Sequence, residues 1–224
     1  IYTIFMSKTS KSGIEKNEPA PIRSFYREYR PQKFEDVIGQ DQVITVLQAA
    51  IKNNSIVHAY IFAGTRGTGK TTVARLFARA LDTAEEDIYE IDAASNNSVE
   101  DMRSLTESIT TLPFRSRFKV YILDEVHMFS KSAFNAFLKT LEEPPAHVLF
   151  ILATTETDKI PETVVSRCQV FQFQTPSTEI LEKVVEKTAK AEKITLEEGV
   201  SELIALSGDG SFRDTLGALQ KVVT

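Results

Sequence analysis

The feature that most constrains the fold of this chain is Gly64–Thr71, which reads G-T-R-G-T-G-K-T. It follows a short apolar run, A-Y-I-F-A, and opens the segment Lys70–Leu81, whose apolar residues recur at helical spacing. This sequence between a strand and a helix is typical of a phosphate-binding loop, because its glycines let backbone N–H groups point inward at a phosphate. The alternative is a glycine-rich turn that only caps a helix. We expect a nucleotide whose phosphates contact Gly64, Thr65, Arg66, Gly67, Thr68, Gly69, Lys70, Thr71 and Thr72.

Side chains in and beyond this loop carry the expected chemistry. Lys70 would reach the β- and γ-phosphates, and the Thr71 hydroxyl would ligate Mg²⁺. The apolar strand Val120–Leu123 ends in two acids, at the sheet edge where open α/β folds bind ligands. There Asp124 would hold Mg²⁺ and Glu125 would act as general base toward water; the alternative is a strand end with solvated acids. His127 completes a D-E-V-H string, but no other helicase motif accompanies it, so we interpret it as structural.

Apolar strands and amphipathic helices alternate as far as Phe173. The expected strands after A-Y-I-F-A are Ile88–Ala93, Lys119–Asp124, Val148–Thr154 and Val170–Gln174. The expected helices are Asp41–Asn53, Lys70–Leu81, Ser98–Thr111, Lys131–Glu142 and Lys159–Ser166. Strands that are apolar throughout and separated by helices predict an α/β fold with a five-stranded parallel sheet covered on both faces.

Three helical patterns follow Pro176 without a strand between them. We therefore expect an α/β domain over residues 25–175 and a small three-helix domain over 176–224. Residues 1–24 show no apolar period and are expected to form a flexible tail.

The composition excludes several classes of protein. With 26 basic and 31 acidic residues the net charge is −5, so any DNA contact would need a local basic patch. No apolar run approaches the ~18–20 residues that span a bilayer, and no secretory leader is recognisable, so no membrane partner is expected. Cys168 is the only cysteine, which excludes an intrachain disulfide and favours a reducing, cytoplasmic location. The chain begins at Ile1, which indicates a piece of a longer protein.

A series of motifs occurs in a family-specific order: Y-R-P (29–31), F-E-D-V-I-G-Q (34–40), the phosphate loop, D-E-V-H (124–127), K-T-L-E-E-P-P (139–145), A-T-T-E-T-D-K-I-P (153–161), S-R-C (166–168) and G-S-F-R-D (210–214). Together they resemble the AAA+ clamp-loader ATPases, and among these the γ/τ subunits of bacterial DNA polymerase III. The resemblance covers the chain from Phe25 onward. It implies a P-loop AAA+ domain with a helical lid, and ATP with Mg²⁺ as cofactors.

The resemblance also implies roles for matching residues. Arg167 would be an arginine finger that acts in trans on a neighbouring subunit's ATP, the alternative being a surface or ion-paired arginine. Thr155 looks like the sensor beside the γ-phosphate, with Thr154 as the neighbouring alternative. Arg213, next to Phe212, looks like the second sensor, carried on the lid. The adenine pocket would use Arg30, Pro31, Val37 and Ile38. The alternative for these four residues is a plain turn-and-staple role.

The function so implied is a motor subunit that uses ATP to open a sliding clamp and load it onto primed DNA. Its partners would be the δ and δ′ subunits, further γ/τ copies, the clamp and primer–template DNA. Similar proteins contact DNA phosphates near the start of the helix after the second strand. The matching candidates are Asn96, Asn97, Ser98 and Arg103, with Lys139 as another. Arg115, Arg117 and Lys119 form a local basic cluster, for which a solvated loop and a DNA contact are equally good interpretations.

One departure from the family stands out. Its members carry a four-cysteine zinc module between the helix that ends near Leu81 and the strand that begins near Ile88. In this chain only the segment Asp82–Asp87 fills that space, and it is short, acidic and free of cysteine. Either this member lacks the module or those residues are missing from the sequence; from the sequence as it stands we expect no zinc and no collar domain after the lid. Alternatives are a non-hydrolysing δ′-like subunit, an AAA+ branch-migration helicase, and an archaeal-type small subunit, which would have Asn in place of Thr155.

Overall fold

The computed structural model describes residues 24–223, so the expected tail lies outside the described residues except for Ser24. The strands are β1 (Ala59–Ala63), β2 (Ile88–Asp92), β3 (Lys119–Asp124), β4 (Val148–Thr154) and β5 (Gln169–Gln172). The helices are α1 (Phe25–Glu28), α2 (Asp41–Lys52), α3 (Lys70–Ala80), α4 (Val99–Ile109), α5 (Lys131–Glu142), α6 (Glu162–Val165), α7 (Thr178–Ala191), α8 (Val200–Ser207) and α9 (Phe212–Val223). Short 3₁₀ turns are η1 (Phe34–Asp36), η2 (Glu85–Asp87), η3 (Val126–Met128) and η4 (Thr157–Lys159).

The five strands form one sheet in the order β2-β3-β4-β1-β5, and every neighbouring pair is parallel. This confirms the predicted five-stranded parallel sheet. Strands β1 and β4 are buried at every position, which explains their uninterrupted apolar sequences. All carboxyl ends lie at one edge, so the loops after β1, β3 and β4 become neighbours.

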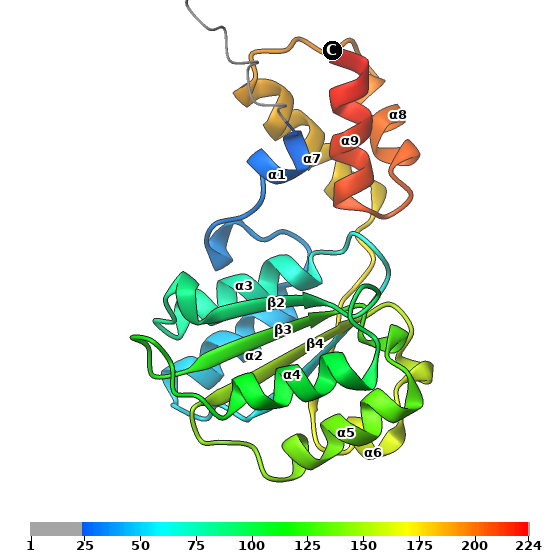
Figure 1. The fold of residues 1–224 in the computed structure, drawn as a ribbon. Coiled ribbons are helices and arrows are strands. Elements are labelled where there is room, and N and C mark those ends of the chain that lie inside the picture. The colour runs from blue at the N-terminus through cyan, green and yellow to red at the C-terminus, as the bar shows by residue number, and fades with distance from the viewer. Residues whose placement is uncertain (1–23, 224) are drawn as a thin grey trace, which may run out of the picture.

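Helices cover both faces of the sheet, α4 and α5 on one side and α2 and α3 on the other (Figure 1). Each face has its own hydrophobic core. Phe150 and Tyr121 pack against Phe137 and Met102 on the α4/α5 face. The side chains that alternate with these along each strand point to the opposite face of the sheet. There Phe62 packs with Phe77 in the core beneath α2 and α3. The resulting three layers are the arrangement that alternating strands and helices require.

The remaining helices, α7, α8 and α9, form a separate body above the carboxyl edge of the sheet, which we call the lid (Figure 1). Phe25 of α1 is buried in the lid core with Val185, Ile204 and Leu219. The Phe25 backbone N–H donates to Gln220 Oε1 at 3.0 Å. Helix α1 therefore packs with the lid, although the sequence placed it in the α/β domain expected over residues 25–175.

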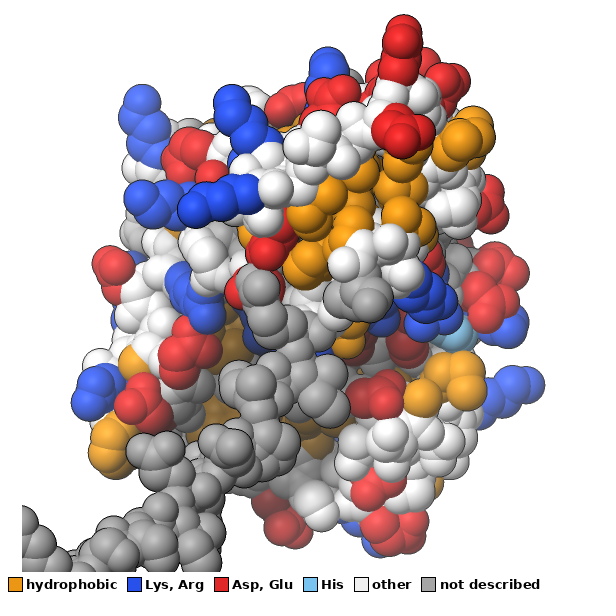
Figure 2. Space-filling view, turned by 90° about the horizontal axis from the view of Figure 1, so that it is seen from above, with side chains coloured by type: hydrophobic (Ala, Val, Ile, Leu, Met, Phe, Trp, Pro, Cys, Tyr) orange, Lys and Arg blue, Asp and Glu red, His pale blue; other side chains and the backbone are white. Residues whose placement is uncertain are grey.

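The outer surface of the lid carries exposed hydrophobic side chains, namely Leu203, Leu206 and Val222. In the view down onto the lid, hydrophobic groups gather between charged ones (Figure 2). Within residues 24–223 no helix is both long and apolar enough to cross a membrane.

The helix expected over Lys159–Ser166 is wrong as a single element. The structure has η4, then an extended Ile160 with φ −83° and ψ 129°, and then the single turn α6. Pro161 explains the break, because a proline disfavours the helical conformation of the residue before it and cannot donate a helix hydrogen bond.

The buried carboxylate of Asp87 holds the short link between α3 and β2 in place. Asp87 is fully buried, and it accepts N–H groups of Phe114 at 2.5 Å, Arg115 at 3.1 Å and Ser116 at 2.9 Å. Burial by itself would raise the pKa of Asp87, but these hydrogen bonds together hold the pKa below its usual value. The carboxylate thus ties the link to the loop that precedes β3.

We expect Asp87→Asn to destabilise the fold by about 1–3 kcal/mol, because the amide NH₂ group would face backbone donors it cannot satisfy. Since folding lowers the pKa of Asp87, its stabilisation is present above the unfolded value of ~3.9 and is lost as the pH falls through the folded value. The deficit of the variant, measured by urea unfolding, should therefore shrink below about pH 4. Asp82→Asn, an exposed change in the same link, is the control; an equal effect of both would contradict the prediction.

Candidate nucleotide-binding site

A cavity of about 900 Å³ lies between the lid and the carboxyl edge of the sheet. Most of the nucleotide-binding residues expected from the sequence line it, along with both acids after β3. Gly64 and Thr65 are the two exceptions, and they lie at the start of the loop. The lining residues from that prediction are Arg30, Pro31, Val37, Ile38, Arg66, Gly67, Thr68, Gly69, Lys70, Thr71, Thr72, Asp124, Glu125, Phe212 and Arg213.

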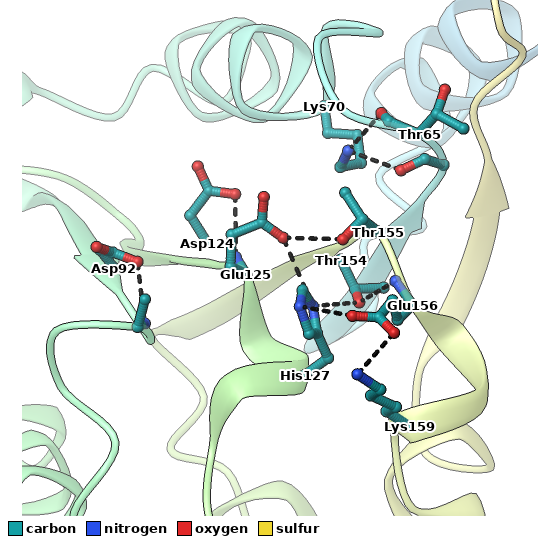
Figure 3. Close-up of polar contacts among 12 residues, drawn as sticks. Thr65, Lys70, Asp92, Asp124, Glu125, His127, Thr154, Thr155, Glu156 and Lys159 are labelled. Atoms are coloured by element: carbon teal, nitrogen blue, oxygen red, sulfur yellow. Dashed lines mark hydrogen bonds and ion pairs between the residues drawn. The ribbon is translucent and has the colours of Figure 1, made fainter.

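The phosphate loop joins β1 to α3, and Gly69, with φ 101°, precedes the first turn of the helix. Lys70 Nζ donates to the carbonyl oxygens of Gly64 and Thr65, each at 2.8 Å, which fixes the ammonium beside the loop (Figure 3). Burial lowers the pKa of Lys70, while the nearby carboxylates of Glu125 and Asp124 oppose that shift. A cation is thus held where a phosphate entering the loop would meet it.

The residues present fit a magnesium ion. Thr71 Oγ1 donates to Asp124 Oδ2 at 2.9 Å, so a hydroxyl from the start of α3 and a carboxylate from the end of β3 are already adjacent. Hard oxygen donors of this kind suit Mg²⁺, which usually keeps several waters and takes only a few protein ligands.

The predicted adenine side is anchored to α3. Arg30 Nε donates to Thr72 Oγ1 at 2.9 Å, which holds the segment after α1 against the start of that helix. Burial, followed by the neighbouring charge of Arg75, lowers the pKa of Arg30. The apolar side chains of Val37 and Ile38 line the same side of the cavity, so this end can accept a flat, weakly polar group.

The lid docks directly on the phosphate loop. The N–H of Phe212, the first residue of α9, donates to Gly67 O at 3.0 Å. Gly67 has φ +77°, and a Cβ placed there would collide with Ser211. The Arg213 guanidinium lies over the Tyr26 ring, 5.7 Å from its centroid, so α1 also borders the site.

Several residues of the site were missed by sequence reasoning. Gln40 is buried, and its amide pairs with Gln174 O at 2.7 Å and Gln174 N–H at 3.1 Å. Gln40 is the last residue of the V-I-G-Q string, and that string was the sequence signal that could have identified it. Tyr26 and, on α7, Lys187 and Thr188 also line the cavity; since they come from outside the motifs, only the docking of the lid brings them there.

Glu125 stands at the end of β3 with a left-handed backbone, φ 49°. Thr155 Oγ1 donates to Glu125 Oε2 at 3.3 Å. The two threonines considered for the sensor therefore differ in their contacts, since Thr155 contacts the acid and Thr154 contacts His127 (Figure 3). Glu125 lines the cavity, which places a carboxylate next to Lys70 and near the predicted metal ligands.

Arg167 does not line this cavity. Its guanidinium donates to Glu142 Oε1 and to Thr163 O, both at 2.7 Å, and its side chain is 35% exposed. It therefore lies at the outer end of α6, away from its own phosphate loop. Burial raises the pKa of the adjacent Cys168 thiol to about 12, so it stays neutral.

The DNA-contact candidates lie around α4 and α5. Arg103 and Lys139 are exposed on these two helices, which pack side by side on one face of the sheet. Ser98 is instead used as the N-cap of α4, in a capping box with Asp101. Lys119 is buried and donates to Ser108 O at 2.7 Å, so the basic cluster around it is no continuous surface patch.

A phosphate loop after β1, paired acids after β3 and a helical lid over the cavity define a P-loop nucleotide-binding protein of the AAA+ class. Solved structures agree on the fold. The RuvB Holliday junction branch migration motor of Thermotoga maritima superposes with a TM-score of 0.74 at 23% identity, over 87% of this chain and 65% of that one. A DNA polymerase III gamma subunit-related protein of T. maritima gives 0.59 at 20% identity, over 78% and 57%.

The sequence comparisons are more specific. The family model described as "DNA polymerase III, delta subunit" matches residues 39–97 and 82–177, more than half of the chain, so the chain belongs to that family. It is 43% identical to the DNA polymerase III subunit tau of Bacillus subtilis, over 90% of this chain and 40% of that protein. The tau subunit of Escherichia coli gives 43% over 88% and 34%. The chain thus spans less than half of these relatives.

The contact between lid and phosphate loop can be tested at Gly67. Gly67→Ala should lower the melting temperature more than Gly199→Ala, because both positions have a positive φ near 80° but a Cβ at Gly199 meets nothing within 4 Å. The extra cost of the clash with Ser211 is about 1–3 kcal/mol by the usual scale of overpacking. Equal melting temperatures for the two variants, in thermal unfolding, would show that the lid does not rest on Gly67.

Proposed function

We propose that this chain is an ATP-binding and ATP-hydrolysing motor unit of the bacterial DNA polymerase III clamp loader. The observation that carries the proposal is the grouping of Lys70, Thr71, Asp124 and Glu125 in one cavity beneath the lid. The relatives at 43% identity are subunits of DNA polymerase III, which supports the assignment to that polymerase. The phosphate loop would bind ATP, Thr71 and Asp124 would hold Mg²⁺, and Glu125 would activate water.

The motor would work in an assembly. Thr155 and Arg213 would sense the γ-phosphate, from β4 and from the lid. Arg167, which does not line its own cavity, would complete the site of a neighbouring subunit, where an arginine finger is worth ~10³–10⁵ in rate. The partners would be δ, δ′ and further γ/τ copies. The assembly would open the sliding clamp and load it onto primed DNA.

DNA contact would come chiefly from Arg103 and Lys139. The start of α4 is less suited to phosphate than expected, because the Asp101 N–H is already bonded to Ser98 and Glu100 and Asp101 add negative charge there. A δ′-like role without hydrolysis is disfavoured by the complete set of catalytic groups. The branch-migration alternative rests on structures at 20–23% identity, which show the fold alone.

Lys70→Ala should abolish ATP binding, because the loop would lose its one phosphate-directed ammonium. Isothermal calorimetry with ATP·Mg²⁺ measures this directly. Lys52→Ala removes an exposed lysine from the end of α2 and should leave the affinity unchanged. An unaltered Kd in Lys70→Ala would overturn the assignment of the loop.

Arg167→Ala should leave the ATP affinity of the chain nearly unchanged, yet cut DNA-stimulated turnover of the assembled loader at least about ten-fold, or ~1.4 kcal/mol. Glu142→Gln, which removes the ion-pair partner but keeps the arginine, should retain activity.

A mixing experiment tests the trans arrangement. Complexes that combine Arg167→Ala with Lys70→Ala subunits should hydrolyse ATP only at interfaces with an intact Arg167 facing an intact Lys70. A large loss of ATP affinity in the isolated Arg167→Ala chain would instead place this arginine in its own site.

A further inference from the structure

His127 lies in η3, just after the two acids of β3, and its side chain is only 7% exposed. The sequence suggested a structural role for it. Its surroundings are polar, however, and each ring nitrogen faces a carboxylate. Nδ1 lies 3.5 Å from Glu125 Oε2, and Nε2 lies 3.3 Å from Glu156 Oε1.

The ring is also held by Glu156, at Nε2, and by Thr154, at Nδ1. Glu156 also pairs with Lys159 at 2.7 Å, and its backbone N–H donates to Thr154 Oγ1 at 3.0 Å. Thr154 Oγ1 in turn lies 3.1 Å from His127 Nδ1. Figure 3 shows the ring between the loop after β4 and the carboxylate of Glu125. A short polar chain therefore runs from η4 through the ring to Glu125.

Glu125 itself needs such support. Its side chain is 34% exposed and can adopt several rotamers. Thr155 Oγ1 and His127 Nδ1 both approach the same oxygen, Oε2, and Figure 3 shows the other oxygen directed away from the ring. Two contacts on one oxygen leave the second oxygen oriented and available to accept a proton, which is the arrangement a general base requires.

We infer that His127 is a positioning residue for Glu125: through Nδ1 it fixes the carboxylate in the orientation that activates water. This inference rests on the proposed hydrolytic role of Glu125. His127 contacts neither the phosphate loop nor the predicted metal ligands in the described interactions, so it acts on the rate of hydrolysis and leaves ATP binding intact.

Three substitutions separate the two faces of the ring. His127→Asn keeps a polar atom near the position of Nδ1, His127→Gln keeps one near Nε2, and His127→Leu keeps neither. In the full-length protein within its assembled complex, His127→Leu should lower kcat for ATP at least ten-fold. His127→Asn should stay within about three-fold of the unsubstituted protein, and His127→Gln should be as slow as His127→Leu.

Binding and stability are measured beside the rate. The Kd for ATP should change less than two-fold in all three variants. Because Thr154 O accepts the Gly64 N–H of the phosphate loop, a merely structural defect at Thr154 would weaken ATP binding as well. Melting temperatures set an assay temperature at which every variant is folded.

The outcomes are distinct. If the unsubstituted complex hydrolyses ATP and His127→Leu retains its kcat, the inference is wrong and the proposed function stands. If His127→Gln is active and His127→Asn is not, contact with Glu156 matters and positioning through Nδ1 is wrong. If the unsubstituted complex binds ATP without hydrolysing it, the proposed function itself fails.

Discussion

The parallel pairing of the strands is the constraint on which the site depends. Because β1 pairs with β4 and β3 pairs with β4 in the same direction, all three end at one edge. The phosphate loop, the acids and the two threonines then face one another without any long excursion of the chain. The hydrogen bond from Thr71 at the start of α3 to Asp124 at the end of β3 joins residues that are 53 positions apart, and it exists only because the sheet places them together.

The lid depends on a second, smaller set of contacts. It meets the α/β domain at Gly67, where the N-terminus of α9 rests on the phosphate loop, and α1 packs with it through the buried Phe25. The segment after α1 carries Arg30, which bonds to α3. The lid is therefore connected both to the predicted adenine side and to the predicted phosphate side of the cavity. A nucleotide bound there would act on the position of the lid through both connections.

The two kinds of similarity carry different weight. The fold is shared with RuvB at 20–23% identity, which reflects how many functions one architecture supports. The DNA polymerase III relatives share 43% of residues over about nine tenths of the chain. The family follows from the family model that matches residues 39–97 and 82–177, and the chemistry must be argued from the side chains in the cavity.

The sequence alone determined the α/β class, the five strands and the phosphate loop, because apolar runs, helical spacing and the G-x-x-x-x-G-K-T pattern are local signals. It also predicted Asp124 and Glu125 as site residues from their place at the end of an apolar strand, and both line the cavity. It failed where local signals compete, as at Pro161, which divides one expected helix in two. The strand order, the docking of α1 with the lid and the burial of Asp87 and Lys119 required the tertiary structure. So did the place of His127 between two carboxylates, since contacts between residues distant in sequence depend on how the layers pack.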